Sequence, residues 1–466
     1  MSNTSHKPLP FINRLAFGMG DLGTAMVSMI KGFLLLGFLI KIAGLSAFQA
    51  GWVLLLTKIW DAVNDPFVGT LTDRTRTPWG RRRPWLLFGS IAFAIAFILS
   101  FYAPNLANDG FWSARFWYYV LVGVLLDAAF TAVNVPYAAL TPELSSDAKE
   151  RNTLNMFRFI FSVLGGLVAI LIFQAVIGAF QPDERTGNFI AAIVVGAIVL
   201  FSGVFAFAFT REKDFSQESE QTLGYIEGLR LAFANRAFVI TTLIYLFSWL
   251  AIQFVQSALQ LYFADWLGAD GGTFFITVAL LQTCIAVGVI VWSIVGNRIG
   301  QKRVYYIGMA FWIVVQISLF FVQPGQITLA MGLAVLAAIG VAVGFIVPWN
   351  LLPAVVDYDE LQTGQRREGV YYGFFVFLQK LGISLGLWVQ GLVLGWAGYI
   401  SVEYGQPAPD SQPASALLAL RLMISFAPIL MLILGILAVR AYPISPERHA
   451  EILDEIAKRK QSKHAA

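Results

Sequence analysis

Residues 58–66 read Lys58-Ile59-Trp60-Asp61-Ala62-Val63-Asn64-Asp65-Pro66 and place two carboxylates four residues apart inside a long apolar segment. On a helix, side chains at positions i and i+4 lie on the same face. A charged side chain at the centre of a bilayer costs about 2.5 to 3.5 kcal/mol, so two of the same sign need a compensating cation. The pattern favours a site for a mobile cation at Asp61 and Asp65; a structural ion pair with a lysine elsewhere is the alternative.

The composition places this stretch in a membrane protein. Of the 466 residues, 58% are hydrophobic and 13% are charged, which is far more apolar than a soluble domain. At about 20 residues per span, the length accommodates roughly twelve helices. The net charge of +4 comes from Lys and Arg of the loops, so nucleic acid is not expected as a partner. We therefore predict an all-α, polytopic protein embedded in a lipid bilayer.

Apolar runs predict the positions of the spans. The expected helices cover residues 15–42, 46–72, 85–104, 115–141, 153–180, 188–209, 236–265, 272–296, 304–324, 327–355, 370–398 and 416–439. The first run is longer than the apolar core of a signal peptide and contains Asp21 and Lys31, so we expect it to remain as the first span.

The positive charges predict the orientation. Most of the 32 Lys and Arg residues lie in segments that are cytoplasmic if the N-terminus is cytoplasmic. The outer loops then carry Lys41, Arg115, Arg185 and Arg421. Because cytoplasmic loops are enriched in Lys and Arg, we expect both termini in the cytoplasm and the protein in the cell (inner) membrane.

A polar stretch at residues 210–235 divides the predicted helices into two sets of six. Asp73-Arg74 with Gly80-Arg81 after the second helix is echoed by Asn297-Arg298 with Gly300-Gln301-Lys302-Arg303 after the eighth. Two related halves are typical of a major facilitator transporter, whose substrate binds between halves that rock around it. Basic loops that merely anchor helix ends are the alternative. We predict an N-terminal half (1–209), a cytoplasmic linker (210–235), a C-terminal half (236–441) and a cytoplasmic tail (442–466).

The residues that most enzymes use are absent from the predicted spans. Cys284 is the single cysteine, and His6, His449 and His464 lie in the polar tails. This excludes Cys-rich metal sites and histidine-based triads in the membrane. The ATP-binding pattern G-x-x-x-x-G-K-[ST] does not occur. We expect no enzyme activity and no cofactor, so an ion gradient or diffusion drives any transport.

A small set of charges lies within the predicted spans, with acidic and basic members in balance. The set comprises Asp21, Asp61, Asp65, Asp127, Lys31, Lys58, Arg158 and Lys380. Intramembrane charges usually face the bundle interior and mark ion or substrate pathways. For any single member, a fixed salt bridge is the competing interpretation.

Polar positions on three further spans suggest the wall of a cavity. Asn134 lies on the fourth span, Gln256 on the seventh, and Trp349 beside Asn350 on the tenth. An aromatic ring can stack on a sugar face while a neighbouring amide bonds a hydroxyl. Plain packing is the alternative for Trp349, and hydrogen bonding between helices is the alternative for Gln256.

Four groups of residues together resemble a known family. They are Asp61-Ala62-Val63-Asn64-Asp65-Pro66, the loop Asp73-Arg74-Thr75-Arg76-Thr77-Pro78-Trp79-Gly80-Arg81-Arg82-Arg83-Pro84-Trp85, Asn134-Val135-Pro136-Tyr137, and Asp357-Tyr358 followed by Thr363-Gly364-Gln365-Arg366 and Glu368-Gly369. They resemble the glycoside-pentoside-hexuronide:cation symporters, which are melibiose-permease-like members of the major facilitator superfamily. The resemblance spans nearly the whole chain and implies cation-coupled sugar transport.

The resemblance implies a cation site. Asp61 and Asp65 match the pair that binds the coupling Na⁺ or H⁺ in the family. Thr131 matches a hydroxyl ligand beside them, and Lys380 matches a lysine near that site. The choice between Na⁺ and H⁺ stays open, although the neutral oxygen of Thr131 favours Na⁺.

The resemblance also implies a substrate site. Asp21 matches a substrate-binding aspartate, and Arg158 matches an arginine of the cavity and the cytoplasmic gate. Gly20 and Asn134 stand where melibiose permease has a lysine and a second sugar-binding aspartate, so melibiose itself is not implied. The chain is also similar to the animal sodium-dependent lysophosphatidylcholine symporter, which has an acidic residue at the position of Asp127. We therefore predict that Asp127 belongs to the substrate site and that a lysolipid is a second substrate class.

For the cytoplasmic gate, we predict contacts between a basic loop and acidic residues that follow the tenth span. The residues are Arg81, Arg82, Arg83, Asp357, Asp359 and Glu360. Surface ion pairs are weak, so the alternative interpretation is that these charges only set the orientation of the spans in the membrane.

The sequence therefore predicts a Na⁺- or H⁺-coupled symporter that works by alternating access, with a sugar or glycoside as substrate. Cation-driven lysophospholipid symport is the alternative within transport. A non-transporting sensor or scaffold on a transporter fold is the alternative from another class.

Overall fold

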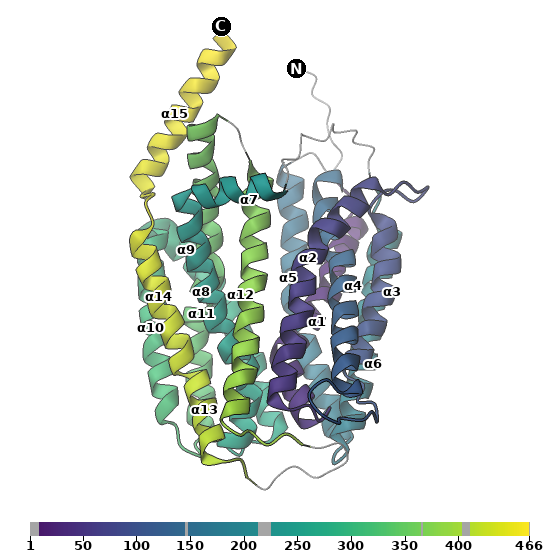
Figure 1. The fold of residues 1–466 in the computed structure, drawn as a ribbon. Helices are drawn as coiled ribbons and strands as arrows, with labels where there is room; N and C mark the ends of the chain where they lie inside the picture. Colours follow the sequence, from purple (N-terminus) through teal and green to yellow (C-terminus); the bar gives the residue numbers. More distant parts are fainter. Residues whose placement is uncertain (1–8, 145–147, 213–224, 365–366, 403–410, 466) are drawn as a thin grey trace. The chain divides into compact units, whose positions relative to one another are not determined.

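A computed structural model describes residues 9–144, 148–212, 225–364, 367–402 and 411–465. These residues form helices and one isolated bridge between Thr77 and Gly80, and Figure 1 traces the helices in chain order. Eleven helical segments in the described part of the chain are long and apolar enough to cross a membrane. The second helix, α2 (Ala47–Arg74), is long but less apolar because it carries Lys58, Asp61 and Asp65. The prediction of an all-α, polytopic fold is confirmed.

The chain divides into two compact units, of which unit 1 comprises Met1–Gln217, Gln256–Gln282 and Leu387–Ala419. In unit 1, α1 packs mainly on α5 and α6, α2 packs on α4, and α3 packs on both α4 and α6. Its helices are α1 (Phe11–Lys41), α2, α3 (Arg83–Ser100), α4 (Ala114–Leu144), α5 (Ala148–Ala179), α6 (Glu184–Phe209) and the π-helix η1 (Tyr262–Trp266).

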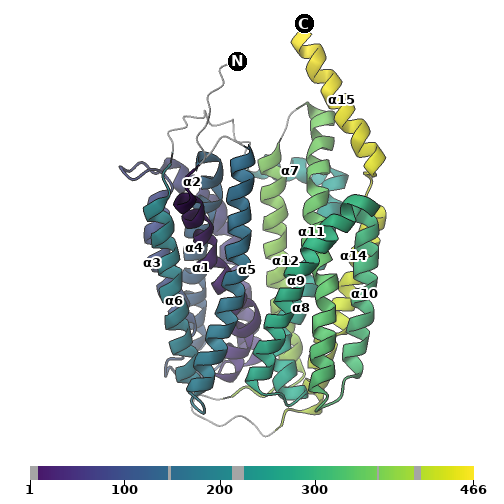
Figure 2. The ribbon, with the colours of Figure 1, turned by 180° about the vertical axis from the view of Figure 1, so that it is seen from behind.

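Unit 2 comprises Glu218–Val255, Thr283–Gly386 and Leu420–Ala466. Its helices are α7 (Tyr225–Ala234), α10 (Gln301–Phe321), α11 (Ile327–Thr363), α14 (Phe426–Ala441) and α15 (Pro446–Ala465). Within this unit, α10 packs on α11 and α14, and the three helices lie side by side in Figures 1 and 2. Four helices contribute to both units: α8 (Arg236–Leu261), α9 (Gly271–Ile299), α12 (Glu368–Trp396) and α13 (Ala414–Ile424).

The predicted spans are helical, and most ends differ by a few residues. The span predicted at 416–439 is divided into α13 and α14 at Ser425. The prediction that the tenth span ends at residue 355 is wrong, because α11 continues to Thr363. Asp357, Asp359 and Glu360 are therefore buried residues of a helix rather than members of a loop. The helix ends where Gly364 takes a φ of +73° and donates its N–H to the Glu360 carbonyl, a left-handed conformation that glycine adopts without steric cost.

Two predicted polar segments contain regular structure. The linker predicted at 210–235 includes α7, while residues 213–224 lie outside the described residues. The tail predicted at 442–466 forms α15. The boundaries predicted for the two halves stay a prediction.

A π-helical turn extends α8 within unit 1. The turn η1 carries Asp265, whose carboxylate accepts hydrogen bonds from Lys41 Nζ and Tyr399 Oη, both at 2.6 Å. Burial and the adjacent Asp265 carboxylate raise the pKa of Tyr399, so its hydroxyl stays protonated and donates. The turn thereby ties the end of α1 to the segment that follows α12.

Candidate cation and substrate site

The polar face of α2 points into the protein. Lys58, Asp61 and Asp65 recur at helical spacing on one side of α2, and Asp61 is only 1% exposed. Val63 and Phe67, at intervening positions, are 64% and 67% exposed. Because exposed apolar side chains suit a lipid environment, α2 directs its carboxylates away from lipid, as expected for an intramembrane cation site.

A glycine on α4 lets α2 approach closely. Gly123, Asp127 and Thr131 are spaced by four residues on α4, so they share one face. A Cβ atom at residue 123 would lie 2.3 Å from Cγ2 of Thr57 on α2, so a larger residue would push the helices apart. The close packing brings the next two positions of that face, Asp127 and Thr131, against the charges of α2.

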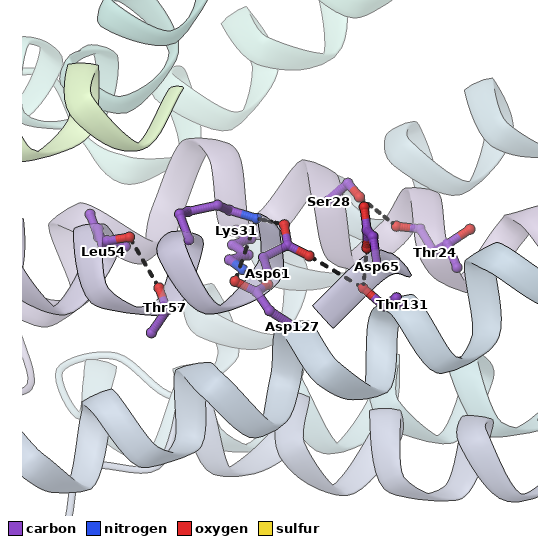
Figure 3. A network of polar contacts seen from close by, with 10 residues as sticks. Thr24, Ser28, Lys31, Leu54, Thr57, Asp61, Asp65, Asp127 and Thr131 are labelled. Carbon is purple, nitrogen blue, oxygen red and sulfur yellow. Dashed lines mark hydrogen bonds and ion pairs between the residues drawn. The ribbon is translucent and has the colours of Figure 1, made fainter. Parts of the chain in front are cut away.

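The predicted cation ligands come together at this contact. Thr131 is fully buried, and its hydroxyl oxygen lies 2.9 Å from Asp65 Oδ1 and 3.3 Å from Asp61 Oδ1 (Figure 3). Carboxylate and hydroxyl oxygens are ligands that hard cations such as Na⁺ prefer. The structure therefore places three suitable oxygens within one small region of unit 1.

Two lysines that the sequence analysis left without a role also reach this region. Lys58 Nζ lies 2.9 Å from Asp61 Oδ2 and 3.4 Å from Asp127 Oδ2. Lys31 of α1 donates to Asp127 Oδ1. The i, i+3 spacing of Lys58 and Asp61 in the sequence could have indicated that these two side chains pair. No local sequence pattern indicates the pairing of Lys31 with Asp127.

A second charged cluster lies where α1, α4 and α5 meet. Arg158 Nε is 3.6 Å from Asp21 Oδ2, and the guanidinium carbon lies 4.6 Å from the centre of the Tyr137 ring. A Cβ atom at residue 20 would lie 2.5 Å from Tyr137 Cε2, so Gly20 leaves room for this ring. The predicted substrate residues Asp21 and Arg158 are thus adjacent, and Tyr137 is a further member of the site.

Two other predicted substrate residues of unit 1 are Asn134 on α4 and Gln256 on α8. Asn134 is half-buried and follows Thr131 by three residues on α4. Gln256 packs against α1, where a Cβ atom at residue 32 in place of Gly32 would lie 2.2 Å from its Nε2. Gln256 therefore packs between α8 and α1, and its role at a substrate site stays a prediction.

In unit 2, Trp349 belongs to an aromatic cluster. Its ring is edge-on to Tyr245 at 5.7 Å and to Phe375 at 5.5 Å between ring centres, and those two rings stack at 4.0 Å. Trp349 is 38% exposed, so part of its ring remains accessible. Lys380 is half-buried on α12, and its role at the cation site stays a prediction.

The predicted gate residues of unit 1 contact a carboxylate through their backbone. The N–H groups of Arg81, Arg82 and Arg83 donate to Glu212 at 2.6, 2.7 and 2.7 Å. Backbone N–H groups at a helix start bind anions, so Glu212 fixes the loop to the end of α6. The Arg83 guanidinium also donates to the Phe207 carbonyl at 2.8 Å.

The predicted gate residues of unit 2 lie near the last helix. Asp357 Oδ2 is 2.9 Å from Nε2 of His449 on α15, and Asp359 and Glu360 are buried on α11. Contacts between these carboxylates and the arginine loop stay a prediction.

Comparison with known proteins decides the family. Residues 16–446 match the family described as MFS/sugar transport protein. The chain belongs to this family. It is 34% identical to an uncharacterized symporter of Synechocystis over 99% of both chains. It is 28% identical to sodium-dependent lysophosphatidylcholine symporter 1-A of Danio rerio, over 94% of this chain and 86% of that protein.

The fold agrees with that assignment. A bacterial homologue of the human lysosomal transporter Spinster superposes with a TM-score of 0.67 at 14% identity, over 95% of this chain and 97% of that one. The resemblance to symporters of the major facilitator superfamily is confirmed. The protein is an integral membrane transporter of the symporter type, not an enzyme.

Proposed function

We propose that this protein is a Na⁺- or H⁺-coupled symporter that carries a sugar or glycoside into the cell by alternating access, with both termini in the cytoplasm. The observation that carries the proposal is the convergence of the Asp61 and Asp65 carboxylates on the Thr131 hydroxyl. Two carboxylates in a low-dielectric region repel each other, and a bound cation or proton removes that repulsion. These residues provide three oxygen ligands for Na⁺, whereas a proton needs only one carboxylate oxygen.

The charges around these oxygens support binding of one monovalent cation. Within unit 1, Lys31 and Lys58 both pair with Asp127, and Lys58 also pairs with Asp61. A monovalent cation between Asp61 and Asp65 would lower the repulsion between these two carboxylates.

A substrate that binds better when the cation is present must, in turn, tighten cation binding by the same factor. The adjacent Asp21 and Arg158 supply acceptors and donors for sugar hydroxyls. Inward movement of one net charge gains about 2.3 kcal/mol per 100 mV, which drives roughly fiftyfold accumulation. This is the energy that the proposed coupling makes available to the sugar.

Uptake into liposomes tests the proposal. The purified protein is reconstituted, and accumulation of a panel of radiolabelled glycosides is followed under an inward Na⁺ or H⁺ gradient. We expect accumulation by the native chain and its loss in Asp61→Asn, with Asp109→Asn as a matched control because Asp109 is an exposed carboxylate. Undiminished accumulation by folded Asp61→Asn would contradict the assignment of the cation site.

A lysophospholipid is the second candidate substrate. The supporting observation is the similarity, over most of both chains, to a relative named as a sodium-dependent lysophosphatidylcholine symporter. The same liposomes distinguish the two candidates, because cation-driven movement of labelled lysophosphatidylcholine without glycoside uptake favours the lipid.

A further inference from the structure

One face of unit 1 joins helices that the sequence assigns to different halves. The segments Gln256–Gln282 and Leu387–Ala419, which contain the ends of α8 and α12, belong to unit 1 together with α1 and α2. The end of α1 lies at the membrane face opposite to the N-terminus, because the 31 residues of this helix span about 46 Å. In the proposed orientation, this face is the outer one.

The backbones of α2 and α12 touch near this face. A Cβ atom at residue 391 of α12 would lie 2.5 Å from the Cα atom of Gly51 on α2 and 2.7 Å from the Ala47 carbonyl oxygen. Backbone atoms of two packed helices cannot move aside as a flexible side chain can, so a larger residue here would push the helices apart. Two helices in backbone contact leave no room for a sugar or a lipid between them.

The contact between α1 and α8 is close but weakly bonded. The side chains of Gln256 and Gln260 lie where Cβ atoms would stand at positions 32 and 37 of α1, which are glycines. Gln260 Oε1 is buried and accepts no hydrogen bond from the part of the chain that the structure describes. A buried acceptor without a donor costs free energy, so this contact holds the two helices less firmly than paired polar groups would.

Stronger bonds close the same contact at its outer end. Asp265 accepts a hydrogen bond from Lys41 through Oδ1 and another from Tyr399 through Oδ2, both at 2.6 Å. Hydrogen bonds to an ionised group are shorter and stronger than neutral ones. Asp265 therefore ties the end of α1, from the first predicted half, to η1 and to the chain after α12, from the second.

Transport by alternating access needs this tie to break. Asp21, a predicted substrate residue, precedes Lys41 on α1 by about 30 Å along the helix. A substrate that reaches Asp21 from the outer face enters between the two halves and so passes the level of Lys41. Because alternating access opens one face at a time, the tie is broken in one stage of the cycle and formed in another.

We propose that Lys41, Asp265 and Tyr399 form a latch that holds the outer face of the protein closed and releases when that face opens to substrate. The inference rests on the proposed function, because it needs alternating access and a cytoplasmic N-terminus. Breaking the latch favours the outward-open conformation, and a permanent cross-link between α1 and η1 prevents it.

A second ion pair of α1 shows what a permanent tie looks like. Arg14 Nε lies 2.8 Å from Glu150 Oε1 at the start of α5, and the two side chains are 24% and 10% exposed. The side chains of Lys41 and Asp265 are similarly placed, at 25% and 14% exposed. Both members of the Arg14–Glu150 pair belong to the first predicted half, so transport gives that pair no reason to break. It is therefore a matched control.

Accessibility of a cysteine at the predicted substrate site tests the latch without any substrate. Asn134→Cys is placed in a chain whose native cysteine is replaced (Cys284→Ser), and the full-length protein is labelled with a membrane-impermeant maleimide. Labelling rates are measured from the outer face in right-side-out vesicles and from the cytoplasmic face in inside-out vesicles. We expect Asp265→Asn and Lys41→Met each to raise the outer rate and lower the inner rate, which changes their ratio roughly tenfold or more.

Three further variants define the cause. Glu150→Gln should leave the ratio of outer to inner labelling within about twofold, because it breaks a tie inside one half. Tyr399→Phe removes one hydrogen bond and leaves the ion pair, so it should shift the ratio roughly threefold, and it serves if the stronger variants do not fold. Gly391→Leu should raise the ratio as the latch variants do, because the added side chain prevents α2 and α12 from packing.

A cross-link should have the opposite effect. In the Cys284→Ser chain, the cysteines of Lys41→Cys/Asp265→Cys are joined by a short bifunctional thiosulfonate. The joined protein should not accumulate glycoside in liposomes under a cation gradient, and a reductant that releases the cross-link should restore accumulation.

Two results would overturn the latch: folded Asp265→Asn and Tyr399→Phe keep the native labelling ratio, or Glu150→Gln changes it as much as they do. A rise in outer labelling without a fall in inner labelling would also overturn it, because local loosening of unit 1 explains that pattern.

The proposed function can fail separately. If the ratio shifts as expected but the native protein accumulates neither a glycoside nor lysophosphatidylcholine under a cation gradient, the latch stands, and the proposed substrate and coupling fail. If the native protein accumulates a glycoside but the ratio does not shift, the proposed function stands and the latch fails.

Discussion

The two charged clusters of unit 1 differ in how their charges are arranged. In the first, one acid, Asp21, lies beside one base, Arg158. In the second, Lys31 and Lys58 pair with Asp127, Lys58 also pairs with Asp61, and two carboxylates, those of Asp61 and Asp65, converge on the Thr131 hydroxyl. Both lie among helices of an apolar protein, where an uncompensated charge is costly.

The comparison suggests a division of work. In the proposed function, the Asp21–Arg158 pair offers its donors and acceptors to a polar substrate. The two carboxylates at Thr131 would bind the coupling cation, whose gradient would supply the energy. Experiments that alter one cluster at a time can therefore separate cation binding from substrate binding.

Matched neutral substitutions should give the largest difference between the clusters. Asp65→Asn removes one of the two carboxylates at the Thr131 hydroxyl, so we expect cation affinity to fall roughly a hundredfold, about 3 kcal/mol. Asp21→Asn should leave cation affinity within about threefold, because its cluster is separate. Isothermal titration with Na⁺ and Na⁺-dependent thermal shifts measure the cation affinity of both variants. An equal loss of affinity in the two variants would mean that the two clusters do not differ in cation binding.

Helix spacing should have the next largest effect. Gly123→Ala places a methyl group 2.3 Å from Thr57 Cγ2, so α2 and α4 must separate or repack. We expect destabilisation of about 1 to 3 kcal/mol and a roughly tenfold loss of cation affinity. Gly178→Ala is the control, because a Cβ atom there meets nothing within 4 Å. Unchanged cation binding in Gly123→Ala would show that the α2–α4 distance does not matter.

Thr131 distinguishes Na⁺ from H⁺. Thr131→Val removes a neutral oxygen that both carboxylates share, so Na⁺ affinity should fall about tenfold, while protonation still needs only a carboxylate. Thr131→Ser retains the hydroxyl and should bind Na⁺ nearly as the native chain does. Uptake under separate Na⁺ and H⁺ gradients provides the measurement, and identical Na⁺ responses in the valine and serine variants would exclude a ligand role.

Substitutions in the Asp21–Arg158 pair should show the smallest effect. A double-mutant cycle with Asp21→Asn and Arg158→Met should give a coupling energy of about 1 kcal/mol, because both side chains are partly exposed and 3.6 Å apart. Thermal unfolding of the four proteins yields this value. A coupling energy of zero would mean that the two charges do not stabilise each other.

Long apolar runs made the fold predictable. Each expected span appears as a helix because about 20 apolar residues in a membrane have no other way to satisfy their backbone groups. The end of α11 was missed because Asp357, Asp359 and Glu360 look like loop residues by polarity. In the structure, these three polar residues are buried in the last turns of α11.

The candidate site was predictable only along single helices. The i and i+4 spacing of Asp61 and Asp65 indicated a shared face, and the resemblance supplied Thr131. The pairing of Lys31 with Asp127 depends on how α1 and α4 pack, which no local spacing encodes. Likewise, the fit of Gln256 against Gly32 comes from helix packing.

The π-helical turn at Tyr262–Trp266 has a consequence for evolution of the chain. Such a turn contains one residue more than the α-helical turn it replaces, and one residue corresponds to about 100° of rotation around a helix axis. Deletion of a single residue here would restore a regular helix and turn Asp265 away from both Lys41 and Tyr399. The number of residues in this turn is therefore constrained, including at positions where the residue type could change.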